Sequence, residues 1–308
     1  MAFERARAHA VAKPWGVSDL RPFSNATGDK DKVGEIWYER EAASALSSAL
    51  LLKLLFTSQP LSIQVHPDDA YAQSMGQRNG KTEAWYILSA APGAKIAIGL
   101  KRHLSPQQLR EAIDDGSISN LINWRAVFAG DSFLIPAGTI HAIGAGLVVA
   151  EIQQRSDVTF RLFDYGSQRE LHTSQAIAVA LTDAVVLKSE PTHLSPERTR
   201  VVACPYFSLE RLDLPPNSSW RLKADGETWM LGVSGEALAG LLSIAAGESA
   251  FVESASFDFR VGPEGFVALV AYAGDDVMPN LLTHIGSDGV FGQGPKIISA
   301  ARPAGAIQ

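Results

Sequence analysis

Two histidines, one glutamate and one glutamine stand in surroundings that suit a metal site. Gln64 and His66 lie in the segment QVHP, and alternate residues of a strand face the same way. Glu83 and His141 follow later, each next to another β-like run. Two imidazoles, a carboxylate and an amide oxygen form a ligand set that favours zinc, with iron, manganese or cobalt as alternatives. Each histidine by itself is also compatible with a hydrogen-bonded polar residue of a β core.

Polar and apolar residues alternate between positions 151 and 161. One face of the predicted strand carries Glu151, Gln153, Asp157, Thr159 and Arg161. Such a face is usually in contact with solvent. The alternative is the polar interior of a barrel, with a cation for an anionic substrate. The pattern alone leaves both interpretations open.

Short strands must position these side chains. Glycine and proline separate β-rich runs of the length that is typical of an antiparallel sandwich or barrel. One helix interrupts them, with Ser105 as its cap, Pro106 at its first position and Gly116 as its stop. The runs lie at 61–67, 83–88, 95–100, 131–136, 147–153 and 157–165.

A second series of β-rich runs follows Thr199 and predicts a second β domain. Residues 173–197, between the two series, have the pattern of a helix, a strand-like piece and a proline-marked linker. We therefore predict a metal-binding domain over residues 1–195 and a β-rich domain over residues 196–308. The hairpin rhythm of the second series suggests a second barrel without the metal residues of the first.

Several motifs resemble those of known families. The spacing of Gly130, Pro136, Gly138 and His141 resembles the second conserved motif of the cupin barrels. The segments QVHPDD, GKTEAWYIL, PAGTIHAIGAG and EIQQRSDVTFRLFDYG together resemble the type I mannose-6-phosphate isomerases, in particular their shorter bacterial branch. KPWG and GEIWYE resemble N-terminal motifs of that branch. The resemblance implies a mainly β fold: a cupin (jelly-roll) barrel with a short helical insertion near 104–124, and a second, degenerate cupin-like domain.

The resemblance also implies a ligand set. It assigns one zinc ion per chain to Gln64, His66, Glu83 and His141, the residues that spacing had already suggested. This chain departs from the longer family members in lacking their large helical insertion. It also has Gly80 where those members have histidine, so no acid or base role is expected at that position.

The reaction implied is the interconversion of mannose 6-phosphate and fructose 6-phosphate, in which a proton moves between C1 and C2 through a cis-enediol. The oxygen of the enediolate must be stabilised as the proton leaves, which a metal or a guanidinium does. The active-site arginine of the family falls on Arg161, its acidic neighbour on Asp157 and its lysine on Lys81. We expect Arg161 to stabilise the enediolate and Lys81 to contact substrate oxygens or phosphate.

The general base and the phosphate site are less well defined. Glu151, Asp157 and a metal-bound hydroxide are candidates for the base. Asp157 could instead form a structural ion pair with Arg161, and Glu151 a hydrogen bond in the barrel. Lys13, Lys81 and Arg161 are available to the phosphate, and Trp15 either walls the substrate pocket or only packs.

Composition excludes several classes of protein. With 27 basic and 33 acidic residues among 308, the net charge is −6, which argues against a nucleic-acid partner. The N-terminus lacks the apolar core of a signal peptide, and the most apolar stretch, 45–56, is far shorter than the roughly 20 residues of a membrane span. One cysteine, Cys204, excludes an internal disulfide framework. We expect a cytoplasmic protein with a sugar phosphate as its partner; the oligomeric state stays open.

Other functions compatible with such a barrel are a neutral-sugar isomerase, a metal-dependent oxygenase and a sugar-binding regulator without catalysis. Oxygenases usually use two or three histidines and open iron positions. A glutamine ligand and the basic residues Lys81 and Arg161 favour an anionic sugar instead.

Overall fold

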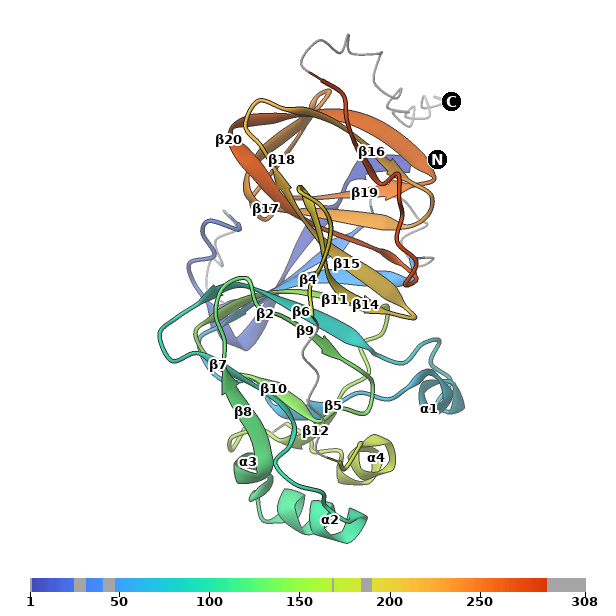
Figure 1. The fold of residues 1–308 in the computed structure, drawn as a ribbon. Coiled ribbons are helices and arrows are strands. Elements are labelled where there is room, and N and C mark those ends of the chain that lie inside the picture. Colours follow the sequence, from blue (N-terminus) through green and yellow to red (C-terminus); the bar gives the residue numbers. More distant parts are fainter. Residues whose placement is uncertain (1, 25–31, 41–47, 168, 184–189, 287–308) are drawn as a thin grey trace, which may run out of the picture.

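The structure is a computed structural model that describes residues 2–24, 32–40, 48–167, 169–183 and 190–286. Strands dominate it, and the predicted mainly β fold is confirmed. Figure 1 shows a barrel of N-terminal strands below a C-terminal sheet, with α2, α3 and α4 at the far end of the barrel. The N-terminal barrel consists of a six-stranded sheet in the order β2-β3-β4-β11-β6-β9 and a five-stranded sheet in the order β12-β5-β10-β7-β8.

All strand pairs of the barrel are antiparallel. The strands of the six-stranded sheet are β2 (Arg7–Val17), β3 (Val33–Glu39), β4 (Leu50–Thr57), β6 (Glu83–Ala90), β9 (Ser132–Ile135) and β11 (Leu147–Gln154). Those of the five-stranded sheet are β5 (Ile63–Val65), β7 (Lys95–Leu100), β8 (Ile122–Ala126), β10 (His141–Ile143) and β12 (Phe160–Phe163).

The C-terminal sheet contains ten strands within the described residues. Its main path runs β1-β19-β17-β20-β15-β14-β13, so the N-terminal strand β1 (Ala2–Arg5) lies among strands from the other end of the chain. The remaining members are β13 (Thr192–Ser195), β14 (Arg198–Cys204), β15 (Phe207–Leu214), β16 (Ser219–Ala224), β17 (Thr228–Ala239), β18 (Leu242–Ala245), β19 (Ser249–Glu253), β20 (Ala255–Ala273) and β21 (Leu282–His284).

One long strand, β20, covers two of the β-rich runs that follow Thr199. These two runs, 257–265 and 266–272, are separated by the turn signal of Gly265 but form a single strand. Gly235 and Gly265 both have positive φ, and a Cβ on Gly235 would lie 2.0 Å from the Gly265 carbonyl oxygen. The two glycines therefore let β17 and β20 bend together, and the chain continues as a strand.

The barrel and the C-terminal sheet share a core. On β4 the alternate residues Leu50, Leu52, Leu54 and Phe56 pack with apolar residues of the C-terminal sheet, Cys204 among them. Cys204 is thus a buried member of the apolar core. Since side chains of a strand alternate, the residues between these leucines point into the barrel. The outer face of the six-stranded sheet is thus closed by apolar contacts.

Helices cover the outer face of the five-stranded sheet, where they pack on its apolar residues. The predicted helix is confirmed as α2 (Pro106–Asp114), with Ser105 and Gln108 forming a capping box. The others are α1 (Asp69–Ser74), α3 (Ile118–Leu121) and α4 (Thr173–Val179). Asp68 caps α1 by accepting from the Tyr71 amide at 2.8 Å.

Two predictions reach outside the described residues. The strand-like piece expected after the helix in 173–197 falls on 184–189, and the second predicted domain includes 287–308. The domain boundary near 195 stays a prediction.

Candidate metal centre

Three ionisable side chains converge between the two sheets of the barrel. His66 follows β5, His141 begins β10 and Glu83 begins β6 on the opposite sheet. The Nε2 atom of His66 lies 3.3 Å from Glu83 Oε2, and the Nε2 atom of His141 lies 3.4 Å from Glu83 Oε1. All three are fully buried, and their ligand atoms lie within 4.8 Å of one another. This group can hold a metal ion.

The hydrogen bonds of the imidazoles fix their orientation. The Nδ1 atom of His66 lies 2.9 Å from the carbonyl oxygen of Val158, and that of His141 lies 2.8 Å from the carbonyl oxygen of Thr139. A carbonyl only accepts, so Nδ1 carries the proton and each Nε2 turns a lone pair towards Glu83. Neither Glu83 oxygen accepts a well-formed hydrogen bond. Acceptors therefore face acceptors in a buried space, an arrangement that fits a cation between them.

Gln64 lies at the edge of this group. It is directly opposite His141 in the pairing of β5 with β10, and its amide nitrogen is 3.3 Å from His141 Nε2. Ser62 donates to the amide oxygen, also at 3.3 Å. Half a turn of the amide would present the oxygen to the same place, because the two ends of the group are nearly equal in shape. Gln64 is thus within reach of a shared ion.

The charges around the cluster favour its metal-binding protonation state. Burial, helped by the charge of Lys81, lowers the pKa of His66 to about 3, and burial also lowers that of His141. Burial alone would raise the pKa of Glu83, but Lys81 and the two imidazoles hold it well below its usual range. Neutral imidazoles and an ionised carboxylate are the forms that bind a divalent ion.

Lys81 is part of the same group. Its Nζ atom lies 3.1 Å from His66 Nε2 and 3.1 Å from Glu83 Oε2, and the side chain is buried. Burial opposes its charge, but Glu83 and other carboxylates raise the pKa of Lys81 above its ordinary value. Lys81 is therefore a cation that is fixed beside the ligands.

The residue before Lys81 explains how this lysine is placed. A Cβ on Gly80 would lie 2.4 Å from the carbonyl carbon of Asp68, so no side chain fits there. The Gly80 amide donates to Asp69 at 2.7 Å, and the Lys81 amide donates to the Pro67 carbonyl at 3.0 Å. The loop that carries His66 crosses directly over Gly80, which excludes a histidine at this position on steric grounds.

Glu151 and Gln153 point into the barrel from β11. Their exposed fractions are 4% and 0%, so the solvated-face interpretation is wrong for both. Glu151 lies between Lys53 and Trp85 in the sheet and accepts from Trp85 Nε1 at 3.2 Å. Burial and the charge of Glu83 raise the pKa of Glu151 to about 7. A carboxylate with such a pKa is suited to proton transfer near neutral pH.

Lys53 is a buried charge that the sequence did not single out. It lies on β4, 3.8 Å from Glu151 and 3.8 Å from Asp157, and its Nζ atom is 4.3 Å from the centre of the Trp37 ring. Burial and the charge of Lys81 lower its pKa. The signal was a single lysine in the most apolar stretch of the chain, on the face opposite to the leucines.

Arg161 and Asp157 do not form the ion pair considered from the sequence. Asp157 is 70% exposed at its side chain and lies beside Lys53 instead. Arg161 is directly opposite Gln64 in the pairing of β12 with β5. Opposing residues of a strand pair project to the same face, and Gln64 reaches His141. Arg161 therefore projects to the side of the cluster.

Lys13 and Trp15 lie on β2, at the edge of the six-stranded sheet. The Lys13 ammonium is 3.2 Å from Glu35, and Trp15 is 7% exposed within an apolar cluster of the barrel. Both Lys13 and Arg169 approach the Trp15 ring, at 5.4 and 5.1 Å from its centre. Arg169, which sequence reasoning missed, is held by Asp164 at 2.5 Å.

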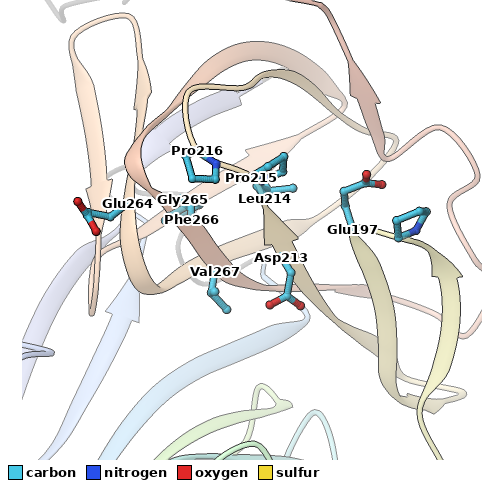
Figure 2. Close-up of a pocket in the computed structure, with 10 residues that line it drawn as sticks. Glu197, Asp213, Leu214, Pro215, Pro216, Glu264, Gly265, Phe266 and Val267 are labelled. Carbon is cyan, nitrogen blue, oxygen red and sulfur yellow. The ribbon is translucent and has the colours of Figure 1, made fainter.

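A hollow of about 390 Å³ lies elsewhere, at the turn between β15 and β16 in the C-terminal sheet. Figure 2 shows Glu197 and Glu264 on opposite sides of it, with Asp213 between them. It is lined by three carboxylates and by no lysine, arginine or histidine. An anionic ligand would be repelled there, so this hollow is not suited to a phosphate ester. Among the described residues, no helix has the length and apolar character that a membrane span requires.

Comparison with known proteins gives a consistent result. Over 169 residues the chain is 41% identical to the mannose-6-phosphate isomerase of Streptococcus mutans, a match that covers 52% of this chain and 53% of that protein. It is 37% identical over 180 residues to the Bacillus subtilis enzyme of the same name, covering 55% and 57%. In these alignments the chain spans about half the length of its relatives. No family model matches the chain.

The fold match is more extensive. The crystal structure of the Bacillus subtilis mannose 6-phosphate isomerase superposes with a TM-score of 0.74 and 25% identity, over 87% of this chain and 98% of that one. The chain is related to the mannose-6-phosphate isomerases. The predicted resemblance and the predicted fold class are thereby confirmed. A zinc-bound mannose 6-phosphate isomerase shares the fold, with a TM-score of 0.71 and 15% identity over 89% of this chain.

Proposed function

We propose that this protein interconverts mannose 6-phosphate and fructose 6-phosphate. The observation that carries the proposal is the convergence of the Nε2 atoms of His66 and His141 on the carboxylate of Glu83, beside Lys81. Such a cluster binds a metal and leaves a fixed cation within reach of the same ligand. The names of the relatives agree with this chemistry.

One zinc ion per chain is held by His66, Glu83 and His141, with Gln64 as the fourth ligand. Its charge polarises a sugar oxygen when it is bound. One carboxylate against a divalent ion leaves about one positive charge, and Lys81 adds a second in the same buried space. Both positive charges attract anions, so they favour anionic oxygens on the substrate.

Proton transfer is assigned to Glu151. The C–H bond at C2 of the aldose breaks and the carboxylate of Glu151 takes the proton. As the ketose forms, Glu151 delivers a proton to C1, and the hydroxyl proton of O2 is transferred to O1. Its pKa of about 7 lets it both accept and release the proton near neutral pH. Lys53 and Trp85 hold the carboxylate in place. Asp157 stays a weaker candidate because its side chain is largely exposed.

Two further groups act on the negative charge. Arg161 projects to the side of the cluster and offers a planar donor pair to the enediolate oxygen. Lys81 is the buried cation nearest the ligands and contacts a sugar oxygen. The phosphate is bound by Lys13, whose ammonium lies beside Trp15 and Glu35.

A coupled isomerase assay on the purified chain tests the proposal. Mannose 6-phosphate is expected to be turned over far better than mannose, activity to vanish after chelation and to return with zinc. In deuterium oxide the product is expected to gain deuterium, because a proton on a carboxylate exchanges with solvent. Equal rates on both sugars would contradict the phosphate assignment, and full activity without metal would contradict the metal assignment.

A further inference from the structure

Arg161 lies on the edge strand β12, which has β5 as its partner on one side. The backbone N–H and C=O groups of Arg161 point away from β5, and both form hydrogen bonds with His172. The His172 amide donates to the Arg161 carbonyl at 2.8 Å, and the Arg161 amide donates to His172 Nδ1 at 3.2 Å. His172 thus provides hydrogen-bond partners for both backbone groups of Arg161 that do not pair with β5.

The protonation state of His172 follows from this contact. Its Nδ1 atom accepts from an amide, so this nitrogen carries no proton and the ring is neutral. Burial and the charge of Arg161 lower the pKa of His172, against a smaller effect of Glu170. The ring also lies 6.0 Å from the ring of Phe160, the neighbour of Arg161. The imidazole is therefore held as an acceptor at the sheet edge.

The segment that begins at His172 reaches the other side of the metal centre. His172 precedes α4, and just beyond the end of this helix the Leu181 amide donates to the Gly138 carbonyl at 2.8 Å. Gly138 lies in the loop before His141 and donates to the carbonyl of His66, also at 2.8 Å. Gly138 has positive φ, and a Cβ there would lie 2.9 Å from the Leu181 side chain. One short segment thus connects the Arg161 strand with the ligand loop.

We infer that His172 is a positioning residue for the isomerase reaction: its two hydrogen bonds to the Arg161 backbone hold the guanidinium on the side of the metal centre. The inference rests on the proposed function. Without the Nδ1 acceptor, β12 keeps its pairing with β5 but loses the constraint on its outer side. The guanidinium then samples other positions, which lowers the rate of the chemical step more than it weakens substrate binding.

Three substitutions distinguish this role from simple packing. In His172→Asn the amide oxygen occupies about the place of Nδ1 and can accept the same hydrogen bond. In His172→Gln that oxygen lies one bond further out, near the place of Nε2, and His172→Ala has no acceptor. His103→Ala is the matched control, since His103 is an exposed histidine whose Nδ1 lies 2.8 Å from Asp183.

Two readouts are measured on zinc-loaded protein. Amide hydrogen exchange of a peptide spanning residues 160–163 is expected to be about 10-fold faster in His172→Ala and His172→Gln, the effect of one lost hydrogen bond. In the same variants kcat is expected to fall about 10-fold, with KM and zinc content nearly unchanged. His172→Asn and the His103→Ala control are expected to stay within about 3-fold of the wild type in both readouts.

Each outcome bears on the inference. Unchanged exchange in both His172→Gln and His172→Ala, or faster exchange with an unchanged kcat, would overturn it. Failure of His172→Asn to restore the rate would also overturn it, because the role would then be structural. If His172→Ala does not fold, the difference in amide exchange and kcat between His172→Asn and His172→Gln tests the inference. A wild type without isomerase activity refutes the proposed function itself, and that result is visible before any variant is made.

Discussion

The barrel and the C-terminal sheet differ in how their buried charged side chains are paired. The barrel interior contains Lys53, Lys81, Glu83 and Glu151, which are paired loosely or share partners. Glu83 has no well-formed hydrogen bond at either oxygen. The interior of the C-terminal sheet is almost entirely apolar among the described residues.

The C-terminal sheet contains a different kind of ion pair. Arg198 donates two hydrogen bonds of 2.8 Å to Glu210, and Tyr272 donates a third to Glu210 at 2.6 Å. The rest of the Arg198 guanidinium donates to the carbonyls of Met278 and Pro279. Here every charge is satisfied within the protein. A buried carboxylate that is fully hydrogen-bonded supports the fold, whereas an unsatisfied one marks a place for a ligand.

The largest expected effect is on Glu83. Glu83→Gln removes the charged ligand that faces two imidazole lone pairs, so zinc affinity is expected to fall by more than about 100-fold and activity with it. The overall fold should survive, because the apolar contacts of both sheets are untouched. Metal analysis after dialysis, with circular dichroism, checks both statements. Full zinc content in this variant would refute the ligand assignment.

Glu210→Gln is the matched change in the C-terminal sheet. It leaves the Arg198 guanidinium buried without its anion, which should lower the free energy of unfolding by about 3–5 kcal/mol. Zinc content per folded chain should stay that of the wild type, since no ligand is touched. Urea denaturation and metal analysis are the measurements. Loss of zinc with unchanged stability would mean that Glu210 supports the metal site and not the fold, which contradicts the difference drawn between the two regions.

Arg161→Lys tests whether a cation of the barrel, which forms no ion pair with the described residues, acts on the substrate. A lysine keeps the charge but not the planar donor pair, so kcat is expected to fall about 100-fold while zinc is retained. Steady-state kinetics on zinc-loaded protein give the result. A variant with the rate of the wild type would mean that charge alone suffices at this position.

The pH dependence of stability tests the strain at Glu151. Its pKa rises from an ordinary 4.5 to about 7 in the folded protein. Between these values the folded state binds more protons than the unfolded state, so this group makes the free energy of unfolding fall as pH rises, until about pH 7. The loss is on the order of 3 kcal/mol.

This effect is isolated by comparing metal-free wild type with metal-free Glu151→Gln, which cannot ionise there. Urea denaturation at about pH 5 and pH 8 should show the wild type losing stability relative to the variant. Parallel curves for the two proteins would mean that Glu151 is not a strained carboxylate.

The smallest expected effect lies outside both interiors. Ser105→Ala removes the cap of α2, where the Gln108 amide donates to the serine hydroxyl at 3.2 Å. The free energy of unfolding should fall by about 1 kcal/mol, without a change in zinc content or kcat. Thermal unfolding and the isomerase assay measure these quantities. A change in kcat would mean that the helical cover affects the site.

Local patterns predicted much of the fold. Most runs between glycine and proline became strands, and the cap signals of Ser105 placed α2 correctly. Long-range pairing could not be predicted in the same way. The entry of β1 into the C-terminal sheet and the continuity of β20 through Gly265 depend on partners that lie far away in the sequence.

The site was predicted only in part. The motif residues Gln64, His66, Glu83 and His141 lie together, and the ligand set itself stays a prediction. Lys53, Arg169 and His172 were missed, because a single lysine, arginine or histidine has no local pattern that reveals a buried or edge position. Their roles follow from what lies opposite them: Glu151, Trp15 and the backbone of Arg161.

The sequence by itself determined the residue types, their alternation along each strand and the order of the motifs. Only the tertiary structure decided which face of each strand is inside. The reason is that a period of two is the same for either face. The C-terminal sheet takes up the leucine face of β4. Lys53 and Glu151 are thereby turned inward, where low solvent exposure strengthens their electrostatic interactions.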